Sequence, residues 1–144
     1  MKRVWISIVL AAIVAIAAGA LLVGCGAEKS EDDYKSMREI SWEGTELTVV
    51  VGANKSTGCE WKTKFEDDSI ITYSLNRKFT LASPNALRSQ AIGTSAIGFE
   101  GKSAGTTKIY LSTPKDWDGN EPGYTYTVTV EVNDDGTIAN ATGE

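Results

Sequence analysis

The chain has 144 residues, enough for one domain of ordinary size, and its 14 basic and 19 acidic residues give a net charge of −5. This acidic balance argues against a surface that binds nucleic acid or anionic membranes. The sequence contains no histidine, which excludes His-based metal sites, Ser-His-Asp triads and the commonest general base.

The first two dozen residues form a segment of their own. Two basic residues precede an uncharged, largely apolar stretch over residues 4–24, as in a secretory signal or a membrane helix. This stretch ends in Leu22-Val23-Gly24-Cys25, which resembles the lipobox of bacterial lipoproteins, where the cysteine is diacylated and becomes the first residue. We expect a signal peptide over residues 1–24 and a lipid on Cys25. The alternative is an uncleaved membrane anchor.

Either interpretation places the rest of the chain on the extracytoplasmic face of a membrane in the cell envelope. Residues 25–41 are charged and poor in aliphatic side chains, which predicts a flexible tether. Residues 135–144 are polar and predict a short frayed tail, so the domain is expected at 42–134. If Cys25 is lipidated, Cys59 has no intramolecular partner, and the domain must be stable without a disulfide.

Between the tether and the tail, apolar and polar residues alternate with a period of two, as in half-buried strands. In chain order the expected strands are Glu46–Val51, Glu60–Phe65, Ile70–Leu75, Lys78–Ala82, Ser95–Glu100, Thr106–Ser112 and Tyr124–Val132. Asn76-Arg77 is predicted to form a hairpin turn between the third and the fourth strand. Seven short strands without a helical stripe predict an all-β, immunoglobulin-like β-sandwich.

Three polar connections are candidates for recognition. Residues 54–59 form a short loop rich in Asn, Ser, Thr and Gly, and the stretches 83–93 and 113–123 are long for a sandwich. The last of these contains Trp117, and a large aromatic residue in a polar loop either packs on the core or contacts a partner. Loops held by a rigid scaffold are frequent binding sites.

Enzymatic and metal-dependent functions find little support in the sequence. The oxygen-bearing side chains over residues 116–121 alternate as in a calcium loop, but the required glycine and the distal glutamate are out of register. Cys59 is either a small buried apolar side chain or a reactive thiol. No phosphate-binding loop or zinc-ligand spacing is present. The sequence therefore predicts neither an enzyme nor a metal or other cofactor.

The candidate loops resemble those of a known family. Asn54 to Trp61 is similar to the Asn-Pro-Thr-Thr-Gly-aromatic-x-Trp signature of the chagasin family, which inhibits papain-like cysteine peptidases. Phe99 followed by Ala104-Gly105-Thr106 resembles the family's aromatic strand and Ala-Gly-Thr step, and Pro114 to Trp117 resembles its Arg-Pro-Trp loop. The resemblance covers about residues 42–132. This sequence departs from the pattern at Lys55, Cys59 and Thr113, which stand where the family has proline, an aromatic residue and arginine.

The resemblance implies a monomeric, reversible inhibitor of papain-like cysteine peptidases, whose three loops enter the active-site cleft. Thr57 and Gly58 would then lie opposite the catalytic thiol, with Pro114 and Trp117 on the enzyme's flank. The residues expected to contact the peptidase are Asn54, Lys55, Ser56, Thr57, Gly58, Ala91, Ile92, Gly93, Pro114, Lys115 and Trp117. The alternatives are an immunoglobulin-like surface lipoprotein that binds another envelope protein or a glycan through the same loops, and a purely structural envelope module.

Overall fold

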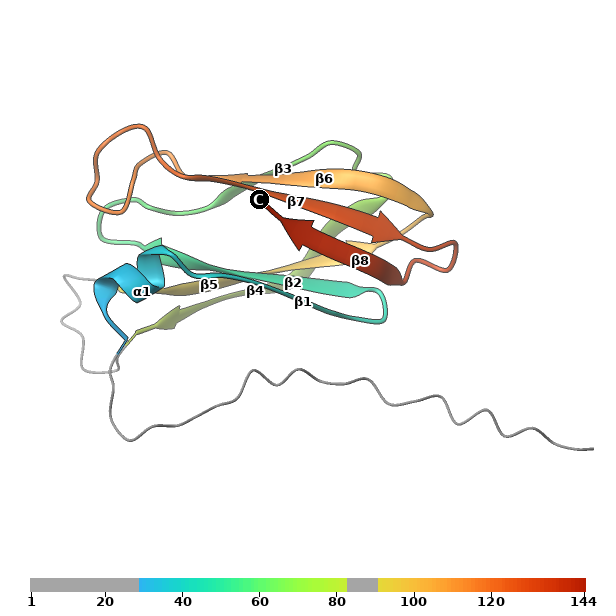
Figure 1. Cartoon of the computed structure of the whole chain (residues 1–144), viewed down its shortest axis with the longest axis horizontal. Coiled ribbons are helices and arrows are strands. Elements are labelled where there is room, and N and C mark those ends of the chain that lie inside the picture. Colours follow the sequence, from blue (N-terminus) through green and yellow to red (C-terminus); the bar gives the residue numbers. More distant parts are fainter. Residues whose placement is uncertain (1–28, 83–90) are drawn as a thin grey trace, which may run out of the picture.

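The computed structural model describes residues 29–82 and 91–144, and for residues 75–77 it describes the backbone alone. Within these ranges, eight strands form two stacked four-stranded sheets, and one short helix lies at one end of the stack (Figure 1). The predicted signal peptide and Cys25 lie outside the described residues. Among the helices that are described, none is long and apolar enough to cross a membrane.

Both sheets are antiparallel throughout. The first has the order β1-β2-β5-β4, formed by β1 (Arg38–Glu43), β2 (Glu46–Asn54), β5 (Ile92–Gly101) and β4 (Ile71–Leu81). The second has the order β3-β6-β7-β8, formed by β3 (Lys62–Phe65), β6 (Gly105–Ser112), β7 (Thr125–Val132) and β8 (Ile138–Gly143). The helix α1 (Glu31–Lys35) precedes β1. The prediction of an all-β sandwich is confirmed.

The core lies between the two sheets and follows from the alternating pattern. Leu47, Val49 and Val51 of β2 are 0% exposed and point from the first sheet toward the second. Val128 and Val130 of β7 are likewise 0% exposed on the opposite wall. The strands β2 and β7 thus bury alternate side chains, which holds their register because a slip by one residue would expose the whole set.

One predicted turn is wrong. Asn76-Arg77 does not reverse the chain; residues 71–81 instead form the single strand β4 along β5. The pairing passes from Tyr73 opposite Phe99 to Arg77 opposite Ile97, so two extra residues of β4 are accommodated in an irregularity of the ladder. A bulge absorbs such residues and bends the strand without ending it, which period-two patterning alone does not distinguish from a turn.

Both flanking segments hold regular structure, contrary to the expectation of a flexible tether and a frayed tail. Within residues 25–41, α1 and most of β1 are ordered parts of the fold, and β1 pairs with β2 as an edge strand. Within residues 135–144, β8 pairs with β7, and Ile138 and Ala141 are buried. These elements were missed because their exposed, charged or small residues resemble a linker, and their order depends on pairing and contacts with neighbouring strands.

Candidate functional site

Three of the predicted loop segments lie at the same end of the sandwich, the left end in Figure 1. The name loop end is used here for Asn54–Cys59, Ala91–Gly93 and Thr113–Tyr124 together. Asn54 pairs with Ile92, and the Lys55 N–H donates to the Ala91 carbonyl at 3.0 Å, so the first two segments are adjacent. Residues 83–90, the remainder of the second stretch, lie outside the described residues.

The loop over residues 54–59 is closed by its own backbone. The Cys59 N–H donates to the Asn54 carbonyl at 3.0 Å, and the Asn54 N–H donates to the Cys59 carbonyl at 3.3 Å. Gly58 has φ +77, a left-handed conformation that residues with a Cβ adopt only with strain. The glycine at this position is therefore required by the turn.

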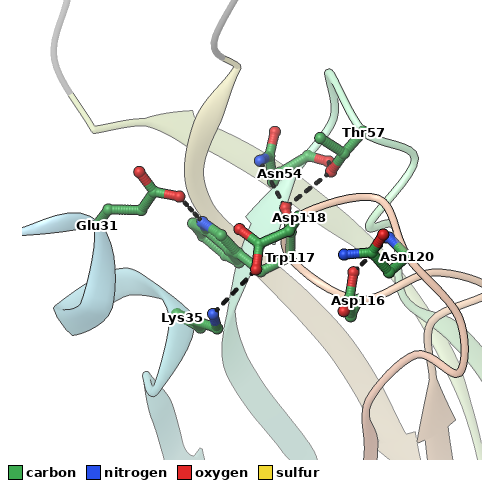
Figure 2. Close-up of polar contacts among 8 residues, drawn as sticks. All are labelled: Glu31, Lys35, Asn54, Thr57, Asp116, Trp117, Asp118 and Asn120. Atoms are coloured by element: carbon green, nitrogen blue, oxygen red, sulfur yellow. Dashed lines mark hydrogen bonds and ion pairs between the residues drawn. The ribbon is translucent and has the colours of Figure 1, made fainter.

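The side chain of Asn54 joins this loop to the third segment, as Figure 2 shows. Its Nδ2 donates to the Trp117 carbonyl at 3.0 Å, and its Oδ1 accepts from the Ser56 hydroxyl at 2.6 Å. The Thr57 hydroxyl donates to the same Trp117 carbonyl at 3.1 Å. Asn54 is 5% exposed, so in the described structure its side chain holds two loops together and is not accessible for contact with a peptidase.

Replacing Asn54 tests this link. Asn54→Ala should lower the free energy of unfolding by about 1–3 kcal/mol, because it removes a buried donor and acceptor and leaves their partners with fewer hydrogen bonds. Chemical denaturation measures the change. Asn140→Ala, at an exposed position on β8, is the matched control and should change stability by less than about 0.5 kcal/mol. Equal effects of the two substitutions would contradict the structural role.

Trp117 does not present its ring at the surface. It is 1% exposed, and its indole Nε1 donates to a carboxylate oxygen of Glu31, on α1, at 2.6 Å (Figure 2). The expectation that this ring contacts a peptidase directly is therefore corrected: in the described structure it packs beneath α1 and against the strand below. Its position in a polar loop reflects a buried anchor, the first of the two roles open to such a residue.

The other predicted residues differ in exposure. Gly93 is buried within β5, where an added Cβ would overlap the Thr80 carbonyl, so it offers no side-chain contact. The exposed members are available for direct contact with a partner: Lys55, Ser56, Pro114 and Lys115. Partly exposed members are Thr57, Gly58, Ala91 and Ile92. The accessible surface of the loop end is thus a subset of the predicted residues, centred on the 54–59 loop.

The third segment folds as a local turn with its own hydrogen bonds. The Asp116 carboxylate accepts from the Asn120 N–H at 2.5 Å, and the Asp116 N–H donates to the Asn120 carbonyl at 2.7 Å. The Asp116 carboxylate, one of the groups whose spacing is similar to that of a calcium loop, therefore stabilises the turn. Among the described residues, no group of three or more Cys, Asp or Glu side chains is placed to hold a metal ion.

Cys59 is 0% exposed, and its burial raises the pKa of the thiol above the ordinary value of 9.0, which outweighs the opposing hydrogen bonds from its surroundings. A thiol attacks as its thiolate, so a raised pKa and lack of access both suppress its reactivity. Of the two interpretations of Cys59, the structure favours the buried apolar side chain.

This interpretation predicts the outcome of thiol labelling. In the Cys25→Ser variant, where Cys59 is the one remaining cysteine, a thiol-reactive disulfide reagent at pH 8 should label the folded protein to below about a tenth of the denatured level. Full labelling is expected in guanidinium chloride. Rapid stoichiometric labelling of the folded protein would mean that Cys59 is accessible and reactive.

The sequence and the fold of the chain are similar to those of known proteins. The model of the chagasin family peptidase inhibitor I42 matches residues 42–132, which is more than half of the chain. The chain belongs to the chagasin family. A search of curated proteins found no match. Among solved structures, the chain is similar to a cysteine protease inhibitor from Entamoeba histolytica, with 23% identity, a TM-score of 0.46 and coverage of 60% of this chain and 77% of that one.

As a member of the chagasin family, the chain is assigned to a group of peptidase inhibitors and not to a class of enzymes. The family match begins at residue 42, so α1 lies outside it, whereas Trp117, which α1 contacts, lies inside it. Sequence reasoning missed Glu31 and Lys35 as members of this chagasin-family site. The signal was Ser30-x-x-Asp33, a capping box in which the side chain of each residue accepts a backbone N–H from the other.

Proposed function

We propose that this chagasin-family protein is a reversible inhibitor of papain-like cysteine peptidases, and that the loop end enters the active-site cleft. The main support for this proposal is that the 54–59 loop, Ala91 and the 113–124 segment lie together at one end of the sandwich. The chain that brings these segments together is a member of a family of peptidase inhibitors.

Occlusion requires shape and rigidity rather than catalytic groups. The 54–59 loop is held by its backbone pairing and by the two hydrogen bonds to the Trp117 carbonyl, so little conformational entropy is lost when it docks. Ser56, Thr57 and Gly58 form the protruding turn, and a cleft that received them would exclude substrate. The exposed Pro114 and Lys115 would contact the cleft wall beside them.

A titration of peptidase activity tests the proposal. The full chain in mild non-ionic detergent should inhibit papain or a cathepsin competitively, with the inhibitor recovered uncleaved and the activity restored on dilution. Pepsin, an aspartic peptidase, is the control enzyme and should retain its activity. Papain and cathepsin activities that are both unchanged at micromolar inhibitor would contradict the proposal and favour binding of another envelope protein or a glycan.

We also propose that the protein is attached to the extracytoplasmic face of a membrane through a lipid on Cys25. The support is the uncharged stretch over residues 4–24 and the lipobox-like sequence that ends it. The anchor would hold the inhibitor at the cell envelope.

Metabolic labelling with a radioactive or clickable fatty acid checks this attachment. The wild-type chain should incorporate the label, and Cys25→Ala should lose essentially all of it because the acceptor thiol is absent. Cys59→Ala is the matched control and should be labelled like the wild type after correction for expression. Label that persists in Cys25→Ala would contradict attachment at this residue.

A further inference from the structure

We propose that α1 is a brace that holds the loop end in its binding shape, with Glu31, Tyr34 and Lys35 as positioning residues. This inference rests on the proposed function and extends it, since it adds a segment that lies before the family-matched region. It makes the inhibitory unit begin near residue 29 rather than at residue 42. Contacts from α1 reach the base of each of the three loop segments.

The first contact is with the 113–124 segment. Glu31 accepts the indole N–H of Trp117 at 2.6 Å, while the carbonyl of the same tryptophan accepts from Asn54 and Thr57 (Figure 2). One residue thereby links α1 to the 54–59 loop. Lys35 adds an ion pair with Asp118 at 3.6 Å, although its exposed position makes it the weaker of the two contacts.

The second contact is with the strand that leads into the 54–59 loop. An added Cβ at Gly52 would overlap the carbonyl of Tyr34, so the end of α1 approaches β2 more closely than any other residue type would allow. The Gly52 N–H donates to the Met37 carbonyl at 3.3 Å at the same place. The segment that follows α1 is thus held on the backbone two residues before Asn54.

The third contact reaches the base of the remaining segment. The Tyr34 hydroxyl donates to the Ala82 carbonyl at 3.4 Å, at the end of β4. Ala82 in turn donates its N–H to the Ile92 carbonyl at 2.9 Å. These two residues flank the connection between β4 and β5, so α1 bonds to one chain end of this connection directly and to the other through Ala82.

The helix α1 and the loops that it contacts stabilise each other. A five-residue helix is far too short to be stable alone in water, so α1 owes its order to its cap and to these contacts. By the same linkage, contacts that order α1 also order the loops that provide them. Loops that are loosened in the free inhibitor must be ordered when they bind, which weakens affinity without removing any residue that touches the peptidase.

The decisive variant is Glu31→Ala in the full chain, compared with Glu31→Gln and Asp32→Ala. Gln retains an oxygen that can accept the Trp117 indole N–H. Asp32 carries a carboxylate in the same first turn, with no side-chain hydrogen bond or ion pair among the described residues, so its replacement controls for lost helix charge. Two readouts are measured: the inhibition constant against papain, and hydrogen exchange over residues 52–60 and 113–124 together with the Trp117 indole.

We expect Glu31→Ala to raise the inhibition constant roughly fivefold to tenfold and to speed exchange at the loops and the indole by a similar factor. Glu31→Gln and Asp32→Ala should stay within about twofold of the wild type. Equal exchange in Glu31→Ala and Asp32→Ala would overturn the brace, and so would faster exchange with unchanged inhibition. If the wild type does not inhibit, the proposed function fails, and the exchange comparison alone decides whether α1 orders the loops.

Discussion

Thr57→Arg is expected to raise the inhibition constant against papain by well over tenfold. Thr57 lies on the protruding turn, partly exposed, and its Cβ is 3.4 Å from where a Cβ on Gly119 would lie, so the site has little room for a longer side chain. An arginine here would either project into the cleft or displace the neighbouring turn. Both outcomes destroy a close fit between the loop and the enzyme. The measurement is steady-state inhibition of papain by the purified variant.

Two further substitutions distinguish the effect of side-chain size at residue 57 from the effect of losing its hydrogen bond. Thr57→Val removes the hydroxyl that donates to Trp117 and Asn54 without adding length, so it should cost about 1 kcal/mol of stability and weaken inhibition only a few-fold. Asp134→Arg introduces the same arginine in the exposed turn after β7, at the opposite end of the sandwich, and should inhibit like the wild type. Strong inhibition by Thr57→Arg would place the contact surface elsewhere.

Trp117→Ala should lower the free energy of unfolding by about 3–5 kcal/mol, the range for large-to-small changes in a protein core. The ring is 1% exposed and packs against Gly52, so its removal leaves a cavity and an unpaired Glu31 carboxylate. Chemical denaturation followed by circular dichroism measures the loss. Inhibition should fall as well, because the carbonyl that Asn54 and Thr57 share would no longer be fixed.

Trp42→Ala is the matched control for this result. Trp42 is 41% exposed in β1, and its replacement should change the free energy of unfolding by less than about 1 kcal/mol. If Trp117→Ala were as stable as Trp42→Ala and yet inhibited poorly, Trp117 would be a direct contact residue. That result would restore the role that the family resemblance implied for it.

The fold was largely predictable because strands of the core alternate clearly. The alternating Tyr126, Val128, Val130 and Val132 of β7 are all buried, as period two requires. The elements that were missed carry a weaker signal, since β8 buries only Ile138 and Ala141 and its pairing depends on tertiary context.

The location of the candidate site was also predictable, but the structural roles of several of its residues were not. Sequence can mark Asn54 and Trp117 as unusual loop residues, yet only the fold shows that they bind each other. Exposure decides whether a polar or aromatic side chain in a loop contacts a partner or the protein itself. It depends on segments far away in the chain, here Glu31, which is 86 residues before Trp117.

The position of α1 beside the loop end has a consequence for an anchored molecule. Ser30 precedes α1, and five residue steps separate it from Cys25, a span of at most about 18 Å of extended chain. A peptidase domain of about 200 residues has a radius of gyration of about 16 Å, and hence a diameter larger than this span. With the lipid on Cys25, the start of α1 would therefore lie within this span of the bilayer surface, and the membrane would restrict the directions from which an enzyme of that size can dock on the loop end.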